Sequence, residues 1–176
     1  MPDADAARAA YVRAYDAARA IDDVDAMVEA ALGLAGTQIF GTIPGRVPAF
    51  LHEAYTRSEG RQRGRIAVAI ARAWAYGGDP TRAESFAAEG LADAEESGDP
   101  ADLAAALDAV LLTRWGPDDF EERVRITKRL EELAEMIRTI DSVKATTNLW
   151  GERWSKLCVN GMANGVAAAT GRSHRI

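Results

Sequence analysis

Three polar residues near the C-terminus, Lys156, Asn160 and Asn164, recur at four-residue intervals. In a helix this spacing places them along one face, each about one turn from the next. A lysine ammonium can donate a proton, and two amides can hold the carboxylate or hydroxyl of a polar substrate. Asparagine and glycine are poor helix residues, yet Gly161 and Gly165 interrupt the same stretch. A segment that departs from local helix preferences at regular spacing is a candidate functional site.

This stretch resembles the start of the helical C-terminal domain of ketopantoate reductase (2-dehydropantoate 2-reductase). The resemblance rests on the Lys-x-x-x-Asn-x-x-x-Asn spacing, with Trp154 two residues before Lys156, and it extends over about residues 131–171. It implies that Lys156 is the general acid that protonates the ketone oxygen while NADPH delivers hydride. It also implies that Asn160 and Asn164 orient the substrate on the same helix face.

The chain shows no motif for binding the reductase's cofactor. No Gly-x-Gly-x-x-Gly follows a predicted strand, so we expect no cofactor in this chain, and NADPH only if the reductase interpretation holds. Residues 36–41 have the glycine spacing of a phosphate loop, but Thr42 and Ile43 follow where Lys and Ser or Thr are required. We therefore expect a loop between helices there, and we do not expect the chain to be an active enzyme alone.

Metal and thiol chemistry have few candidate residues. The single cysteine, Cys158, has no partner for an internal disulfide, and its place on the apolar side of the predicted helix indicates a core thiol. Trp150 and Trp154 share that side and are expected to be core or interface anchors. Two histidines, His52 and His174, do not supply a structural zinc site, so no metal is expected.

Charge divides the chain unevenly. Of 176 residues with a net charge of −6, residues 142–176 carry five basic groups and one acid, which leaves −10 on residues 1–141. The overall negative charge argues against nucleic acid as a partner. The change in composition predicts a domain boundary near residues 131–145, with a helical region over 1–135 and a basic helical segment over 136–176.

The secondary-structure elements that carry these residues are predicted to be helices throughout the chain. Apolar residues at helical spacing predict helices over 5–21, 23–34, 47–57 and 65–76, with Tyr11 and Tyr15 on the inner face of the first. Gly78-Asp79-Pro80 and Gly98-Asp99-Pro100 each combine a helix stop, a cap and a first-position proline. Two later apolar stripes are expected, one of Leu103, Leu107, Val110 and Leu111 and one of Phe120, Val124, Leu133 and Ile137. Interleaved charges over 121–135 predict a solvated helix face.

Helical pairs joined by tight turns predict an all-α fold of antiparallel hairpins stacked as a short repeat array. Residues 72–94 resemble a degenerate tetratricopeptide repeat, on Arg72-Ala73-Trp74-Ala75-Tyr76-Gly77-Gly78-Asp79, Arg82-Ala83 and Gly90-Leu91-Ala92-Asp93-Ala94. Residues 22–134 resemble the helical-repeat region of large actinobacterial ATP-binding LuxR-type regulators, on Ala31-Leu32-Gly33-Leu34-Ala35-Gly36, Ile39-Phe40-Gly41 and Leu112-Thr113-Arg114-Trp115-Gly116-Pro117.

Two functions follow from these resemblances. The first is a non-catalytic interaction module, a fragment or fusion of a regulator's repeat region, that displays a groove to a protein or peptide partner and self-associates. The second is a reductase fragment that contributes Lys156, Asn160 and Asn164 to an assembled oxidoreductase. Without a long apolar stretch or a secretory signal, the chain is expected to be cytoplasmic, with no membrane partner.

Overall fold

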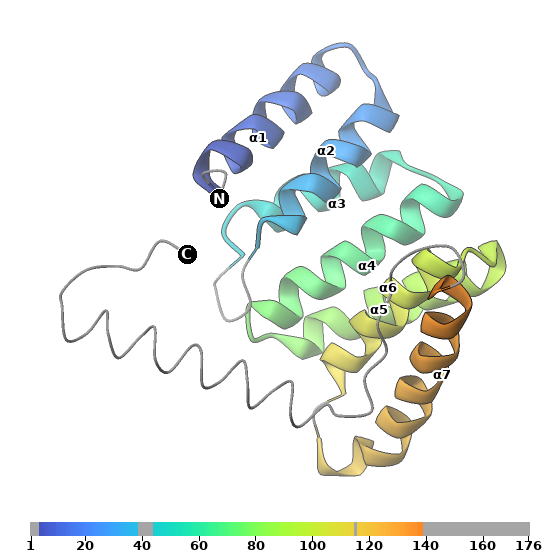
Figure 1. Cartoon of the computed structure of the whole chain (residues 1–176). Coiled ribbons are helices and arrows are strands. Elements are labelled where there is room, and N and C mark those ends of the chain that lie inside the picture. Colours follow the sequence, from blue (N-terminus) through green and yellow to red (C-terminus); the bar gives the residue numbers. More distant parts are fainter. Residues whose placement is uncertain (1–3, 39–43, 115, 139–176) are drawn as a thin grey trace, which may run out of the picture. The chain divides into compact units, whose positions relative to one another are not determined.

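The computed structural model describes residues 4–38, 44–114 and 116–138, and these residues are all helical or in turns between helices (Figure 1). The predicted all-α class is therefore confirmed for the described part of the chain. The helices are α1 (Ala4–Ala20), α2 (Val24–Gly36), α3 (Val47–Arg57), α4 (Gly60–Tyr76), α5 (Pro80–Ser97), α6 (Pro100–Thr113), the 3-10 helix η1 (Pro117–Asp119) and α7 (Phe120–Arg138). None of these described helices is both long and apolar enough to cross a membrane.

The predicted turns around Asp79 and Asp99 are confirmed in detail. The Asp79 carboxylate accepts a hydrogen bond from the Arg82 amide at 3.2 Å, and Pro80 begins α5. The Asp99 carboxylate accepts from the amides of Ala101 and Asp102, and Gly98 ends α5 with a φ of 66°. That left-handed backbone favours glycine, so the sequence of each turn matches its geometry.

The predicted helix over 65–76 begins five residues earlier, at Gly60. Its first turn is rich in glycine and polar residues and therefore lacks a clear helical pattern in the sequence. Contacts from other helices hold it: the Arg61 side chain donates to Asp102 of α6, and the Gln62 amide donates to Asp25 of α2. Tertiary contacts here outweigh weak local propensity.

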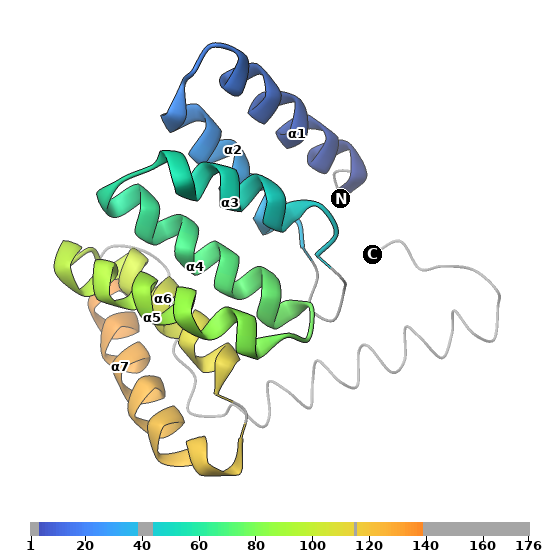
Figure 2. The ribbon, with the colours of Figure 1, turned by 180° about the vertical axis from the view of Figure 1, so that it is seen from behind.

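Consecutive helices pack against one another from α1 to α6, and α4 also contacts α2 and α6 (Figures 1 and 2). Two buried clusters result, one built from α1 to α4 and the other from α4 to α7. Helix α4 contributes Ile66 and Ile70 to the first cluster and Val68 and Ala71 to the second. Because it is buried on opposite sides, α4 is the element that joins the two cores.

The predicted inner face of α7 needs correction, whereas that of α1 faces α2 and is only partly exposed. Tyr15 is fully buried, but Tyr11 is 38% exposed and lies against Gly33 of α2. In α7 the predicted Phe120 and Val124 are 70% and 52% exposed, whereas Leu133 is buried as predicted.

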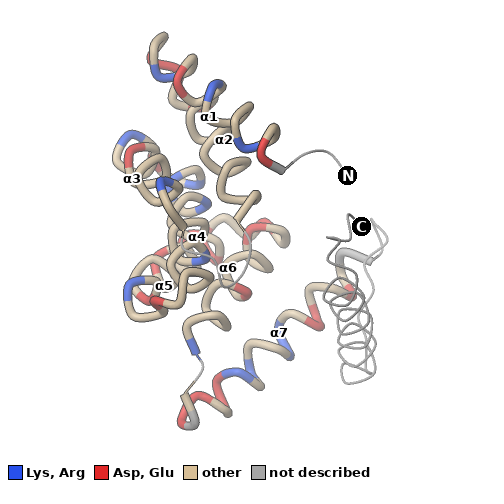
Figure 3. The backbone as a smooth tube through the Cα atoms, turned by 90° about the vertical axis from the view of Figure 1, so that its left-hand side faces the viewer, with Lys and Arg blue, Asp and Glu red and all other residues tan. Residues whose placement is uncertain are grey.

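Ile126 and the half-buried Leu130 replace Phe120 and Val124 in the core. Of the four residues predicted for the α6 stripe, Leu107 and Val110 are buried, and Leu103 and Leu111 pack against the same cluster. The sequence of α7 carries apolar residues on more than one side, so it does not specify which side is buried. Contacts with other helices decide which side faces the core. Charged residues of both signs lie along α7 (Figure 3), and most of those over 121–135 are exposed, as predicted.

The chain divides into two compact units, Pro2–Leu133 and a second one of Ala134–Ile176 with Met1. The groove and the ion pairs described below lie within Pro2–Leu133. The boundary predicted near residue 135 stays a prediction.

Candidate functional site

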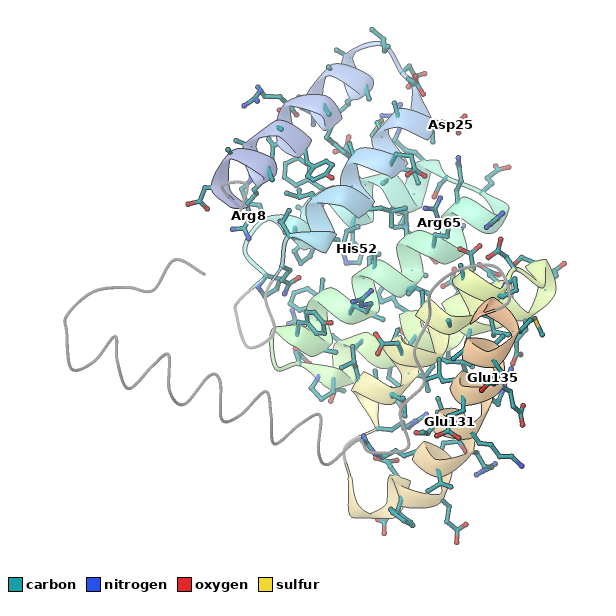
Figure 4. The ribbon with its side chains drawn as sticks, in the orientation of Figure 1. Arg8, Asp25, His52, Arg65, Glu131 and Glu135 are labelled. Atoms are coloured by element: carbon teal, nitrogen blue, oxygen red, sulfur yellow. The ribbon has the colours of Figure 1, made fainter. Side chains whose placement is uncertain are left out.

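The residues predicted to do chemistry lie outside the described part of the chain. This holds for Lys156, Asn160 and Asn164, and equally for Cys158 and the tryptophans at 150 and 154. Their roles stay predictions. His52 is half-buried on α3 (Figure 4). Its ring meets the Phe86 ring edge-on, with centroids 5.3 Å apart.

The candidate site in the described residues is a groove of about 500 Å³ that follows α4 over most of its length. Four helices line it, each through one face. The lining residues are Leu32, Ala35, Gly36 and Gln38 from α2 and its end, Arg61, Gly64, Arg65, Val68, Ala69, Arg72, Ala73 and Tyr76 from α4, Gly90, Asp93, Ala94 and Ser97 from α5, and Ala101, Asp102 and Ala105 from α6. Glycine and alanine make up much of this lining, so the groove is a space left between helices by small side chains.

Ion pairs join α4 to its neighbours along the edge of the groove. Arg61 donates to Asp102 at 2.5 Å and to Asp99 at 2.6 Å, both at the start of α6. Arg65 lies 2.7 Å from Glu29 of α2 and 3.8 Å from Asp102. Asp102, whose side chain is 14% exposed, therefore lies between two arginines. Figure 4 shows Arg65 on α4 in the same region as Asp25 at the start of α2.

The other end of the groove is held by polar contacts of a different kind. The Gln38 amide donates to the Ala73 carbonyl at 3.0 Å, which joins the end of α2 to the last turn of α4. Arg72 donates to the Tyr76 hydroxyl at 3.1 Å and lies 3.6 Å from a carboxylate oxygen of Asp108 on α6. Each of the three arginines that line the groove is thus matched by at least one carboxylate.

Asp93 of α5 is the exception among the charged residues of the lining. It makes no hydrogen bond and no ion pair with any described residue, and it lies directly over Gly64 of α4. A β-carbon at position 64 would stand 2.6 Å from Asp93 Cβ and 2.9 Å from Asp93 Oδ2. Loss of solvent raises the pKa of this carboxyl above its usual value, and the nearby Glu89 and Glu96 raise it further.

A second polar cluster, where α3, α4 and α5 meet, has no unpaired member. The Tyr55 hydroxyl donates to the Glu89 carboxylate at 2.6 Å, and Arg63 donates to that hydroxyl at 2.8 Å. The Arg63 guanidinium also lies over the Tyr55 ring, 4.3 Å from its centroid. Burial and the bond to Glu89 raise the pKa of Tyr55. Its three members bind one another and come from three helices, so the cluster stabilises the packing of these helices.

Sequence reasoning anticipated a groove between helix pairs but named none of its residues. A signal was present on α4, where Arg61, Arg65, Val68 and Arg72 follow one another at spacings of three and four residues beside Gly64. A long polar stripe next to small residues on an otherwise apolar helix indicates a face that borders open space. The described residues contain no group of three or more histidine, cysteine, aspartate or glutamate side chains that could hold a metal ion. No family model, curated protein or solved structure matches the chain.

Proposed function

We propose that this protein is a non-catalytic interaction module that binds an extended peptide segment of a partner protein in the groove along α4. The observation that carries the proposal is the groove itself, about 500 Å³ in volume and lined from four helices. Its lining combines small apolar side chains with arginine and aspartate side chains at the edges. Such a surface can accept a peptide backbone closely and pair its polar groups.

The length of the groove fits a short peptide. The lining residues of α4 run from Arg61 to Tyr76. At a helical rise of 1.5 Å per residue this stretch is about 22 Å long. An extended chain advances about 3.3 Å per residue, so about seven residues would span it.

The packing order supports a repeat-like array as the scaffold of this groove. Each helix from α1 to α6 contacts the next one, and α4 also contacts α2 and α6 two positions away. Stacked helical hairpins produce such a pattern, and their inner helices line one continuous surface. The groove draws most of its lining from α4, the helix with contacts to the most neighbours, and further residues from α2, α5 and α6.

A blocking substitution tests the proposal. Ala101 is an exposed residue of the groove, and Ala88 of α5 is an exposed alanine outside its lining. A random seven-residue peptide library would be selected on the full chain, and binding of the selected peptides measured by fluorescence anisotropy. We expect Ala101→Trp to weaken binding by about tenfold or more, since it fills the groove, and Ala88→Trp to leave binding unchanged. Failure to select any peptide, or equal binding by Ala101→Trp and wild type, would refute a peptide groove.

The reductase alternative rests on Lys156, Asn160 and Asn164 and stays a prediction. It is tested by NADPH oxidation with ketopantoate, with the chain alone and with a separately expressed nucleotide-binding domain. Turnover that is lost in Lys156→Ala would support it over the interaction module.

A further inference from the structure

We infer that the groove along α4 selects a peptide with a lysine or arginine side chain, and that Asp93 is the residue that binds this cation. The inference rests on the proposed peptide-binding function and specifies its ligand. It is carried by the charge balance of the groove, in which every lining arginine is paired and one lining carboxylate makes no ion pair with any described residue.

The arginines of the groove have carboxylate partners within the protein. Arg61 pairs with Asp99 and Asp102, and Arg65 pairs with Glu29 at 2.7 Å. Arg72 lies 3.6 Å from a carboxylate oxygen of Asp108. An anionic ligand would have to compete with these carboxylates for each guanidinium. The arginines therefore do not favour a ligand with a net negative charge.

Asp93 has the opposite character. No described cation forms an ion pair with it, and Arg63, whose charge acts on it from further away than an ion pair, donates to Tyr55 and Glu89. Two further carboxylates, Glu89 and Glu96, act on Asp93 from the same helix. The negative potential around this side chain is therefore only partly compensated, and a cation in the groove would neutralise the remaining charge.

The surroundings of Asp93 suit the stem of a long basic side chain. The carboxylate lies over Gly64, and Ala94, Ala101 and Ala105 are other lining residues of the groove. The methylene groups of lysine or arginine pack on small apolar residues while the charged head reaches a carboxylate. The absence of a side chain at position 64 leaves the room that Asp93 occupies.

Selection from the same random seven-residue peptide library tests the inference. With the wild-type chain we expect lysine or arginine to be enriched at one position of the selected peptides. In Asp93→Asn this enrichment should disappear, and the affinity of a selected peptide should fall about fivefold, the range of one partly exposed ion pair. Asp93→Lys should instead enrich aspartate or glutamate at that position.

Glu84→Gln is the matched control, because it removes the same charge from the same helix at an exposed residue that lies outside the lining and does not act on Asp93. It should keep the preference for lysine or arginine. Peptides that bind without such a preference, or a preference that persists in Asp93→Asn, would overturn this inference and leave the peptide groove standing. Failure to select any peptide sensitive to Ala101→Trp would refute the proposed function itself, and this inference with it.

Discussion

Val68 of α4 lies against Gly90 of α5 so closely that a β-carbon at position 90 would stand 2.5 Å from Val68 Cγ2. The Val68 backbone nitrogen and the Gly64 carbonyl oxygen would be 3.1 and 3.2 Å from the same atom. These backbone atoms belong to a helix buried on opposite sides and have little freedom to move. The approach of the two helices at this point therefore depends on the missing side chain of Gly90.

Gly90→Ala is expected to destabilise the protein by about 1–3 kcal/mol, the usual cost of overpacking a buried contact. The measurement is urea denaturation followed by circular dichroism. Gly36→Ala is the control, because nothing lies within 4 Å of a β-carbon built there. It should leave stability unchanged or raise it, since alanine is the better helix residue. A Gly90→Ala variant as stable as wild type would show that α4 and α5 separate without cost.

Tyr15 is expected to stabilise the core through its hydroxyl as well as its ring. The hydroxyl donates to the Phe50 carbonyl at 3.2 Å, and the two rings meet edge-on with centroids 4.9 Å apart. Tyr15→Phe should lower the free energy of unfolding by about 1 kcal/mol, since it removes the hydroxyl and its hydrogen bond and keeps the ring. Tyr11→Phe, at a partly exposed residue of the same helix, should have little effect in the same urea experiment. Equal losses in the two variants would contradict the role of the buried hydroxyl.

The Tyr15 hydroxyl is also expected to make the stability of the protein depend on pH in the alkaline range. Burial, followed by the nearby Glu53 carboxylate, raises the pKa of Tyr15 well above the usual value of 10.0. The native state thus keeps the phenol protonated where the unfolded chain would ionise it, so stability falls as the pH rises above about 10. Absorbance at 295 nm should show that at least one of the four tyrosines ionises only as the protein unfolds. Titration of all four in a single step near pH 10 with the fold intact would contradict this.

Asp93 and Asp99 are expected to affect stability with opposite dependence on pH. The pKa of Asp93 is raised from 3.8, so its charged form is disfavoured in the native state. Its contribution to the free energy of unfolding therefore becomes unfavourable as the pH rises above about 4. Asp93→Asn should therefore stabilise the protein at pH 7, on the order of 0.5 kcal/mol, and have no effect below pH 4. Urea denaturation at several pH values would measure this. A destabilising Asp93→Asn at pH 7 would show that the carboxylate has a partner.

Asp99 provides the comparison. Hydrogen bonds from the backbone amides of Asp102 and Ala101 lower the pKa of Asp99 below 3.8. Its stabilising contribution is present above pH 4 and is lost as the pH falls through the lowered pKa. Asp99→Asn should therefore be less stable than wild type at pH 7, and the difference should shrink on acidification.

Arg123 of α7 is expected to fix the position of that helix through the end of α6. Its guanidinium donates to the carbonyls of Arg114, at 2.5 Å, and Leu111, at 3.4 Å, which are carbonyls at the end of α6. Arg123→Ala should cost about 1 kcal/mol and should speed hydrogen exchange in residues 120–133. Arg125→Ala is the control, because Arg125 forms an exposed pair with Glu122 within α7 and no ion pair with another described helix. Unchanged exchange in Arg123→Ala would contradict this capping role.

Much of the helix pattern could be predicted because it depends on neighbouring residues. The caps at Asp79 and Asp99 and the prolines that follow act within one turn, so their geometry follows from the local sequence. The start of α4 could not be predicted, since residues 60–64 carry little helical signal and are held by α2 and α6. The core positions predicted for Phe120 and Val124 were wrong for a related reason: an apolar residue lies inside only if another helix covers it.

The sequence by itself determined the all-α class, the ends of most helices and the acidic balance of residues 1–141, because each depends on residue type and short-range spacing. Only the tertiary structure decided which faces of α1 and α7 are buried, and it alone brought α2, α4, α5 and α6 together around one groove. It also decided that the arginines of α4 are neutralised while Asp93 has no ion-pair partner among the described residues. Pairing of charges on different helices depends on distances in space, and residue spacing along the chain does not specify them.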